Sequence, residues 1–150
     1  MKTNDLNQLA EISINYSARV KNTDRAVINS SQSVYNLVRP DWQEINIRES
    51  MKVLYLNRAN KVLGIYELSK GGITGTVVDL RLLFATALKS LSCSIILLHN
   101  HPSGNLKPSQ ADINITNKVK DAGKLLDIQL LDHLIMTEDG FFSFSDEGII

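Results

Sequence analysis

The chain has 150 residues, of which 43% are hydrophobic and 21% are charged, a composition that is typical of a globular protein. This length corresponds to one domain with a core of its own, without disulfides or a structural metal. Its 16 basic and 16 acidic residues cancel, whereas a protein that grips phosphates usually carries a basic excess. The composition therefore argues mildly against DNA binding as the main activity, although it does not exclude a local basic patch.

Cys93 is the only cysteine of the chain, which excludes an intrachain disulfide and a thiolate-rich zinc site. Its place in the apolar run of residues 92–98 predicts a small buried side chain. The first twenty residues lack the continuous apolar stretch of a signal peptide, and no run of the sequence reaches membrane-spanning length. We therefore expect a cytoplasmic protein without a membrane partner.

The first forty residues are less regular than the rest. Alternating apolar and polar residues at 12–16 predict an edge strand. A stretch led by serines at 30–38 predicts a short helix, which Pro40 helps to end. We therefore expect an N-terminal extension at residues 1–40, made of a strand and a short helix and packed on a domain at residues 41–150.

Firmer patterns follow this extension. Residues 51–56 and 62–68 are predicted to form two strands around a polar turn, and a glycine-rich loop at 71–75 comes next. Asp79 is suited to cap a helix. The predicted apolar face of that helix comprises Leu80, Leu83, Phe84, Ala87, Leu88 and Leu91.

The second half of the chain alternates strand and helix again. The apolar stretch at 94–98 is typical of a strand in the middle of a sheet that is covered on both faces. A helix is expected at 109–126, followed by two strands at 128–136 and 141–144. The apolar face that this helix turns toward the core would comprise Ile115, Val119, Ala122 and Leu126. Strands interleaved with helices indicate an α/β layered domain with a mixed sheet.

Two histidines stand at the end of the predicted central strand. His99 and His101 are two residues apart, and in extended backbone this spacing points both imidazoles to the same side. Strand ends in α/β sheets are also where ligand sites gather. After a loop, Asp112 arrives in the first turn of the next helix. Two imidazoles and one carboxylate leave a fourth tetrahedral position for water, which is the pattern of a catalytic zinc site.

Simpler interpretations fit the same residues. His99 and His101 could bond only to loop backbone. Asp112 could act only as the third helical residue of a capping box with Ser109, since Ser-x-x-Asp before an apolar helix suits that role. Spacing alone leaves the choice between these interpretations and a metal site open.

The letters HNHPSG at residues 99–104, followed by Ser109 and Asp112, resemble the JAMM signature of JAB/MPN metallopeptidases. Together with the Leu-Asp-His sequence at 131–133, they are similar to the RadC-like branch of that family. The resemblance runs from residue 48 to the C-terminus. It implies a three-layer α/β/α fold with a mixed central sheet, akin to that of the cytidine deaminases.

The resemblance also implies roles for single residues. His99, His101 and Asp112 would hold one Zn²⁺ per chain, although iron and manganese suit the same ligands. Ser109 would donate a hydrogen bond to the substrate carbonyl as negative charge develops on its oxygen.

A glutamate at the start of a strand acts through the metal-bound water in such proteins, and Glu49 occupies the matching position. It would take a proton from this water, which zinc acidifies, and deliver it to the leaving amine. Glu44 and Glu67 are the fallback candidates for this base. Glu67 lies inside a predicted strand, where a salt bridge or solvent exposure explains it adequately.

The implied function is that of a zinc-dependent metallopeptidase or isopeptidase, with a peptide or protein substrate. The alternative is a DNA-repair or DNA-processing role, as a nuclease or a DNA-binding protein, because RadC-like proteins carry that label. Neutral charge weighs against this alternative. A non-catalytic MPN-like interaction module is a third hypothesis, against which the complete set of ligand residues argues.

The sequence departs from the family in two respects. Nothing in it resembles the helical segment that precedes this domain in longer RadC-like proteins. The usual Pro-Arg pair before the long helix appears here as Leu80-Arg81. A third histidine, His133, lies within a predicted strand beside Asp132, and for both residues we expect a structural or supporting role rather than metal ligation.

Overall fold

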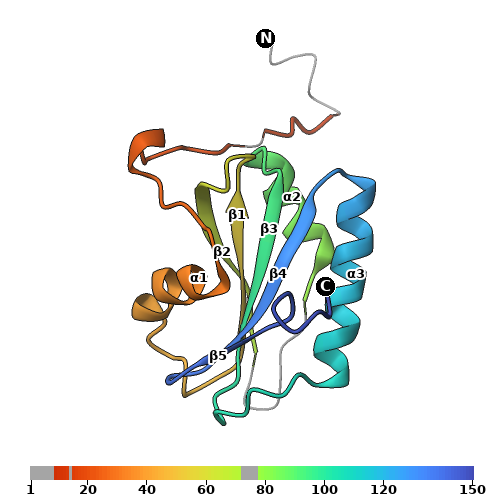
Figure 1. The fold of residues 1–150 in the computed structure, drawn as a ribbon. Helices are drawn as coiled ribbons and strands as arrows, with labels where there is room; N and C mark the ends of the chain where they lie inside the picture. Colours follow the sequence, from red (N-terminus) through yellow and green to blue (C-terminus); the bar gives the residue numbers. More distant parts are fainter. Residues whose placement is uncertain (1–8, 14, 72–77) are drawn as a thin grey trace.

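A five-stranded mixed sheet forms the centre of the computed structural model, which describes residues 9–13, 15–71 and 78–150 (Figure 1). The strand order is β2-β1-β3-β4-β5, and only β3 and β4 are parallel neighbours. The strands predicted from residue 51 onward are all present. They are β1 (Ser50–Leu56), β2 (Val62–Lys70), β3 (Ser94–Asn100), β4 (Gln129–Met136) and β5 (Phe141–Ser143).

Helices cover both faces of this sheet. The helices are α1 (Ser31–Val38), α2 (Leu80–Lys89) and α3 (Gln110–Leu125), with short 3-10 turns at Asn22–Asp24 and Arg39–Asp41. α1 packs on one face, and α2 and α3 pack on the other (Figure 1). The predicted three-layer α/β/α arrangement is therefore confirmed. None of the helices among the described residues has the length and apolar character needed to cross a membrane.

β3 is the centre of both halves of the core. Ile95 and Leu97 belong to the cluster on the α2 and α3 side, whereas Ile96 and Leu98 belong to the cluster on the α1 side. Successive side chains of a strand point to opposite faces, so a strand buried on both faces must be apolar at every position. This arrangement explains why residues 94–98 carry no polar alternation.

The edge strand predicted at 12–16 is wrong for the residues that the structure describes. Ile12, Ser13, Asn15 and Tyr16 lie outside any strand, and Ile14 lies outside the described residues. Ile12 is 86% exposed, so the alternation does not bury an apolar face against a partner. The segment is instead tied to the sheet by the Tyr16 hydroxyl, which donates to a β2 carbonyl at 2.9 Å.

Within the first forty residues, several apolar side chains from residue 28 onward are buried in the core. Ile28, Val34 and Val38 share one apolar cluster with Trp42 and the sheet. Val27 forms an isolated antiparallel bridge to the start of β2. The division of the chain at residue 40 stays a prediction.

Three leucines predicted to face the core are largely exposed. Leu88 is the last but one residue of α2, and Leu91 lies beyond its end with a positive φ of 55°. Leu126 is the C-terminal cap of α3 and not part of its inward stripe. Leu91 and Leu126 therefore fall beyond the last residues of their helices, whereas Leu88 lies within α2 on its exposed side. The other apolar positions predicted for the two helices are buried or half-buried.

In the sequence, Cys93 and the glycine-rich segment adjoin the strands β3 and β2. Cys93 is half-buried rather than buried, because it precedes β3 at the end of the sheet. The glycine-rich loop predicted at 71–75 lies outside the described residues, apart from Gly71, whose N–H donates to the Glu49 carbonyl at 2.9 Å.

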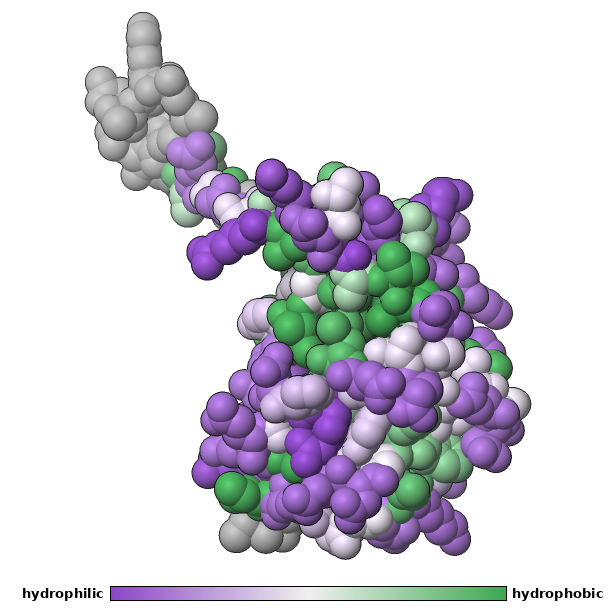
Figure 2. Space-filling view, turned by 60° about the vertical axis from the view of Figure 1, so that its left-hand side comes forward, coloured by the Kyte–Doolittle hydropathy of each residue, from purple (hydrophilic) through white to green (hydrophobic). Residues whose placement is uncertain are grey.

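β2 is one edge of the sheet, and apolar side chains gather on the side of the molecule that β2 shares with α1 (Figure 2). Leu37, Ile65 and Tyr66 are among the exposed apolar residues of these two elements. The pairing of β2 with β1 shifts register at two places. Such irregularities twist an edge strand and discourage further pairing with another chain.

Candidate metal centre

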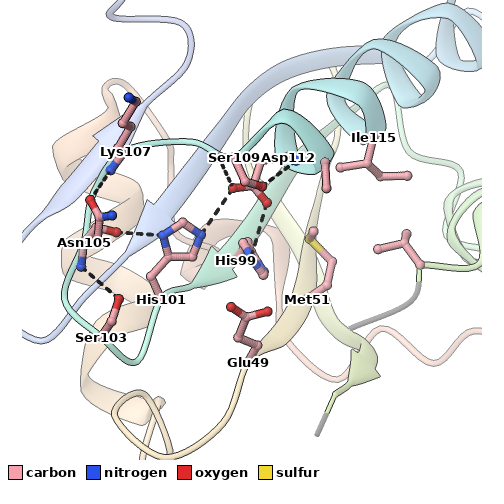
Figure 3. A pocket seen from close by; sticks show the side chains of 12 residues that line it. Glu49, Met51, His99, His101, Ser103, Asn105, Lys107, Ser109, Asp112 and Ile115 are labelled. Atoms are coloured by element: carbon pink, nitrogen blue, oxygen red, sulfur yellow. Dashed lines mark hydrogen bonds and ion pairs between the residues drawn. The ribbon is translucent and has the colours of Figure 1, made fainter. Parts of the chain in front are cut away.

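A pocket of about 590 Å³ lies where β3 ends, β1 begins and α3 starts. Its lining includes all five residues to which the sequence assigned roles (Figure 3), namely Glu49, His99, His101, Ser109 and Asp112. Three separate segments of the chain bring these residues together. They are the turn before β1, the end of β3 and the first turn of α3.

Backbone carbonyls fix the orientation of both imidazoles. The Nδ1 of His99 lies 3.2 Å from the Ser50 carbonyl, and the Nδ1 of His101 lies 2.7 Å from the Asn105 carbonyl. A carbonyl oxygen only accepts, so each Nδ1 carries the hydrogen. Each Nε2 is then left to face the pocket (Figure 3). Metal-binding histidines are commonly held in this way, with one ring nitrogen bonded to the protein and the other free for the cation.

Asp112 takes part in two arrangements at once. Its Oδ2 accepts from the Ser109 N–H at 2.8 Å, while the Ser109 hydroxyl accepts from the Asp112 N–H at 3.0 Å. The capping box that the sequence left as an alternative is therefore formed. The same carboxylate lies 3.5 Å from Nε2 of His99 and 3.3 Å from Nε2 of His101. A cap and a ligand position are thus compatible in one side chain.

Glu49 faces the histidines from the opposite side of the pocket (Figure 3). Its carboxylate and the ring nitrogens of His99 and His101 contain ligand atoms that all lie within 4.8 Å of one another. No ion pair or hydrogen bond from the described residues holds this carboxylate. The two Nε2 atoms therefore have a carboxylate on either side, that of Asp112 and that of Glu49. Such a group of acceptors requires protons or a cation between its members, and this donor set fits a divalent metal ion.

The pKa shifts of His99, His101 and Asp112 reflect how closely these side chains lie together. Burial lowers the pKa of His99, which keeps its ring neutral. The pKa of His101 is raised, chiefly by its hydrogen bond to Asp112. Burial opposes ionisation of Asp112, but hydrogen bonds from His101 and from the Ser109 backbone outweigh it and hold the pKa of that carboxyl well below its usual range. Without a cation, a proton on His101 compensates the charge of Asp112, so metal and proton compete for the same nitrogen.

The two fallback glutamates lie outside the pocket. Glu44 pairs with Lys70 at 2.6 Å and lies 3.8 Å from Arg48, and these contacts are at the surface. Glu67 is within β2, opposite Lys52 in the register of the sheet. Neither residue lines the pocket, so Glu49 is the better-placed candidate for the base.

His133 also lies outside the pocket lining, as a fully buried residue beneath it. Its Nδ1 is 2.7 Å from the Thr116 hydroxyl, which itself donates to the Asp112 carbonyl at 2.6 Å. Its ring stacks on Phe144 with centroids 4.5 Å apart. These contacts agree with the predicted structural role of His133. They also link β4 to the first turns of α3.

Sequence reasoning missed two features of the site. One wall of the pocket is apolar, because Met51, Val78 and Ile115 line it beside His99 (Figure 3). Met51 reaches this wall through its pairing with His99 across β1 and β3, a register that the sequence does not reveal. The second feature is the buried side chain of Asn100, which does not line the pocket but bonds to the backbone on both sides of Glu49. Strand alternation alone could have placed it on the opposite face from the histidines.

Comparison with known proteins identifies the family of the chain. A family model described as RadC-like JAB domain matches residues 28–149. A UPF0758 protein of Flavobacterium johnsoniae is 51% identical over 122 residues, which cover 81% of this chain and 53% of the relative. UPF0758 proteins of Porphyromonas gingivalis and Desulfitobacterium hafniense are 42% and 40% identical, over 84% of this chain and 56% and 55% of their own lengths. The chain thus spans about half the length of these curated relatives. It belongs to the family of RadC-like JAB domains.

Proposed function

We propose that this chain is a zinc-dependent hydrolase of amide bonds, acting on a peptide or an isopeptide linkage in a peptide or protein substrate. The observation that carries the proposal is a pair of imidazoles, both fixed by backbone carbonyls, whose Nε2 atoms lie between the carboxylate of Asp112 on one side and that of Glu49 on the other. A site that only stabilised the fold would gain nothing from a second carboxylate, that of Glu49, which faces the histidines without a hydrogen bond from the described residues.

The ligands in this proposal are His99, His101 and Asp112. The first two present Nε2 and the third a carboxylate that the start of α3 already holds in place. Three protein ligands leave the open position that distinguishes catalytic from structural zinc sites. When bound, zinc would polarise a carbonyl oxygen and lower the pKa of water.

Glu49 is the general base of the proposed reaction. Because no partner among the described residues holds its carboxylate, it is available to accept the proton of the attacking water. The same carboxyl group then delivers that proton to the amine nitrogen as the amide C–N bond breaks. Its position across the pocket from Asp112 (Figure 3) separates the base from the third ligand.

Ser109 supplies a hydrogen-bond donor at the rim of the same pocket. Its hydroxyl oxygen accepts from the Asp112 N–H, while its hydrogen can turn between the Asp112 carboxylate and the pocket. That hydrogen can be donated to the oxygen of the scissile carbonyl as it becomes an oxyanion. The apolar wall on the other side of His99 excludes water from part of the pocket and favours an apolar group next to the scissile bond.

Metal analysis followed by a hydrolysis screen tests the proposal. We expect one zinc ion per chain after reconstitution, lost in His99→Ala and Asp112→Ala and retained in His133→Phe. A panel of peptides and isopeptide-linked lysines should then include substrates that the zinc-loaded parent cleaves and the Asp112→Ala protein does not. Full metal occupancy in His99→Ala would refute the ligand assignment. Metal-dependent cutting of DNA that Asp112→Ala abolishes would instead favour a nuclease.

A further inference from the structure

Asn100 occupies the position between the two histidines and is completely buried. Since side chains alternate along a strand, His99 and His101 face the pocket and Asn100 faces the other side of the sheet. Its Oδ1 accepts from the Ser50 N–H at 2.7 Å, and its Nδ2 donates to the carbonyls of Ile45 at 2.8 Å and Arg48 at 2.9 Å. Both amide hydrogens and the amide oxygen of Asn100 are therefore hydrogen-bonded to one short segment, residues 45–50.

This segment is the one that carries Glu49. Residues 45–49 form turns and bends outside any strand, so no sheet ladder holds them. The amide of Asn100 bonds to the backbone on both sides of Glu49, through Arg48 before it and Ser50 after it. Among the described residues, the one hydrogen bond given for Glu49 itself is from the Gly71 N–H to its carbonyl. The place of its carboxylate therefore depends on the backbone that Asn100 holds.

We propose that Asn100 is the positioning residue of the general base, and that it fixes Glu49 at the distance from the two histidines that hydrolysis needs. This inference rests on the proposed role of Glu49. The end of β3 would then position both the metal ligands and the base, because His99 and His101 bind the metal and Asn100, between them, holds the segment of Glu49. A displacement of this strand end would move ligands and base together.

The chemistry of the contact requires an asparagine. One side chain must accept from an N–H and donate to two carbonyls from a fixed, buried position. Asparagine has two donor hydrogens and an acceptor oxygen at this reach. Aspartate lacks both donors and would place a charge against two carbonyl oxygens, and an apolar residue would remove the bonds to three backbone groups, two of them buried and one part-buried.

A double-mutant cycle separates positioning from general support of the fold. We expect Asn100→Ala to lower kcat roughly 10- to 100-fold with little change in KM, the usual cost of misplacing a reacting group by about 1 Å. In the Glu49→Gln background the same substitution should lower kcat no further, because its effect passes through Glu49. Ser143→Ala is the control, since Ser143 is a buried polar residue that bonds to Asp132 on β4. Losses that add in full in the double variant would overturn the proposal.

Two further measurements need no substrate. With Co²⁺ as the probe, the pH at which its visible absorption changes should shift in Asn100→Ala in the same direction as in Glu49→Gln, and not further in the double variant. Amide hydrogen exchange of residues 45–50 should be faster in Asn100→Ala than in Ser143→Ala under native conditions. An unchanged cobalt titration or unchanged exchange would refute the positioning role. If the parent cleaves no peptide, the proposed function fails, and these two readouts still decide the role of Asn100.

Discussion

The fully buried His133 makes the stability of this domain sensitive to acid. Burial lowers its pKa from 6.5 to about 3, and its Nε2 has no hydrogen-bond partner among the described residues. Between these two values the unfolded chain binds a proton at this residue that the folded chain does not. Stability therefore falls as the pH drops below about 6.5, by about 1.4 kcal/mol for each pH unit. At pH 4.5 the loss from this residue alone amounts to about 2 to 3 kcal/mol.

His133→Phe removes this titration while it keeps a ring against Phe144. The variant loses the hydrogen bond to Thr116, but it also removes a buried unpartnered nitrogen, so at pH 7.5 the free energies of unfolding should agree within about 1 kcal/mol. At pH 4.5 the variant should be the more stable protein by about 2 kcal/mol. Urea unfolding across this range, with a chelator present so that metal binding adds no pH dependence, measures both values. Parallel pH profiles for the two proteins would contradict the assignment of a buried, neutral His133.

Three other predictions follow from the structure. Glu49→Gln should retain zinc, measured by metal analysis, and lose hydrolysis roughly 10²- to 10⁴-fold, whereas Asp112→Asn should lose both, and equal metal loss in the two would argue that Glu49 is a ligand. Gly123→Ala should lower the free energy of unfolding by about 1 to 3 kcal/mol, because its Cβ would lie 2.3 Å from the Ile128 carbonyl oxygen, while Gly64→Ala meets no atom within 4 Å and serves as the control in the same urea unfolding. DNA binding should be weak at physiological salt in a filter or fluorescence assay, and a tight complex with steep salt dependence would reveal a basic surface that the neutral composition hides.

The central strand shows what the sequence could predict about the fold. An unbroken apolar run at 94–98 has one simple explanation, burial on both faces, and β3 has that position. The segment at 12–16 shows the limit, since alternation predicts a strand only where a partner edge receives it. Leu91 and Leu126 show another limit, because an apolar pattern does not mark the residue where a helix ends.

Residues of the pocket that depend on local spacing in the sequence could be predicted, whereas those that depend on the pairing of distant strands could not. His99 and His101 share a face because of strand geometry, and Asp112 was expected near them because it falls in the first turn of the helix that follows their loop. Glu49 came only from resemblance, since nothing in its own segment indicates that it faces the histidines. Met51 needed the pairing of β1 with β3, which is a long-range property that a single sequence does not display.

The order in which this site is built follows from its hydrogen bonds. Each of the three proposed ligands is held by the backbone, through the carbonyls of Ser50 and Asn105 and the N–H of Ser109. The bonds of the two histidines leave their Nε2 atoms for the metal, and the bond from Ser109 engages Oδ2 of Asp112 but not Oδ1. The fold therefore brings these side chains together before a cation is present. In the proposed function, a cation would find its ligands already oriented, so little of its binding energy would be lost to ordering side chains, and selectivity would depend on the geometry that the protein imposes.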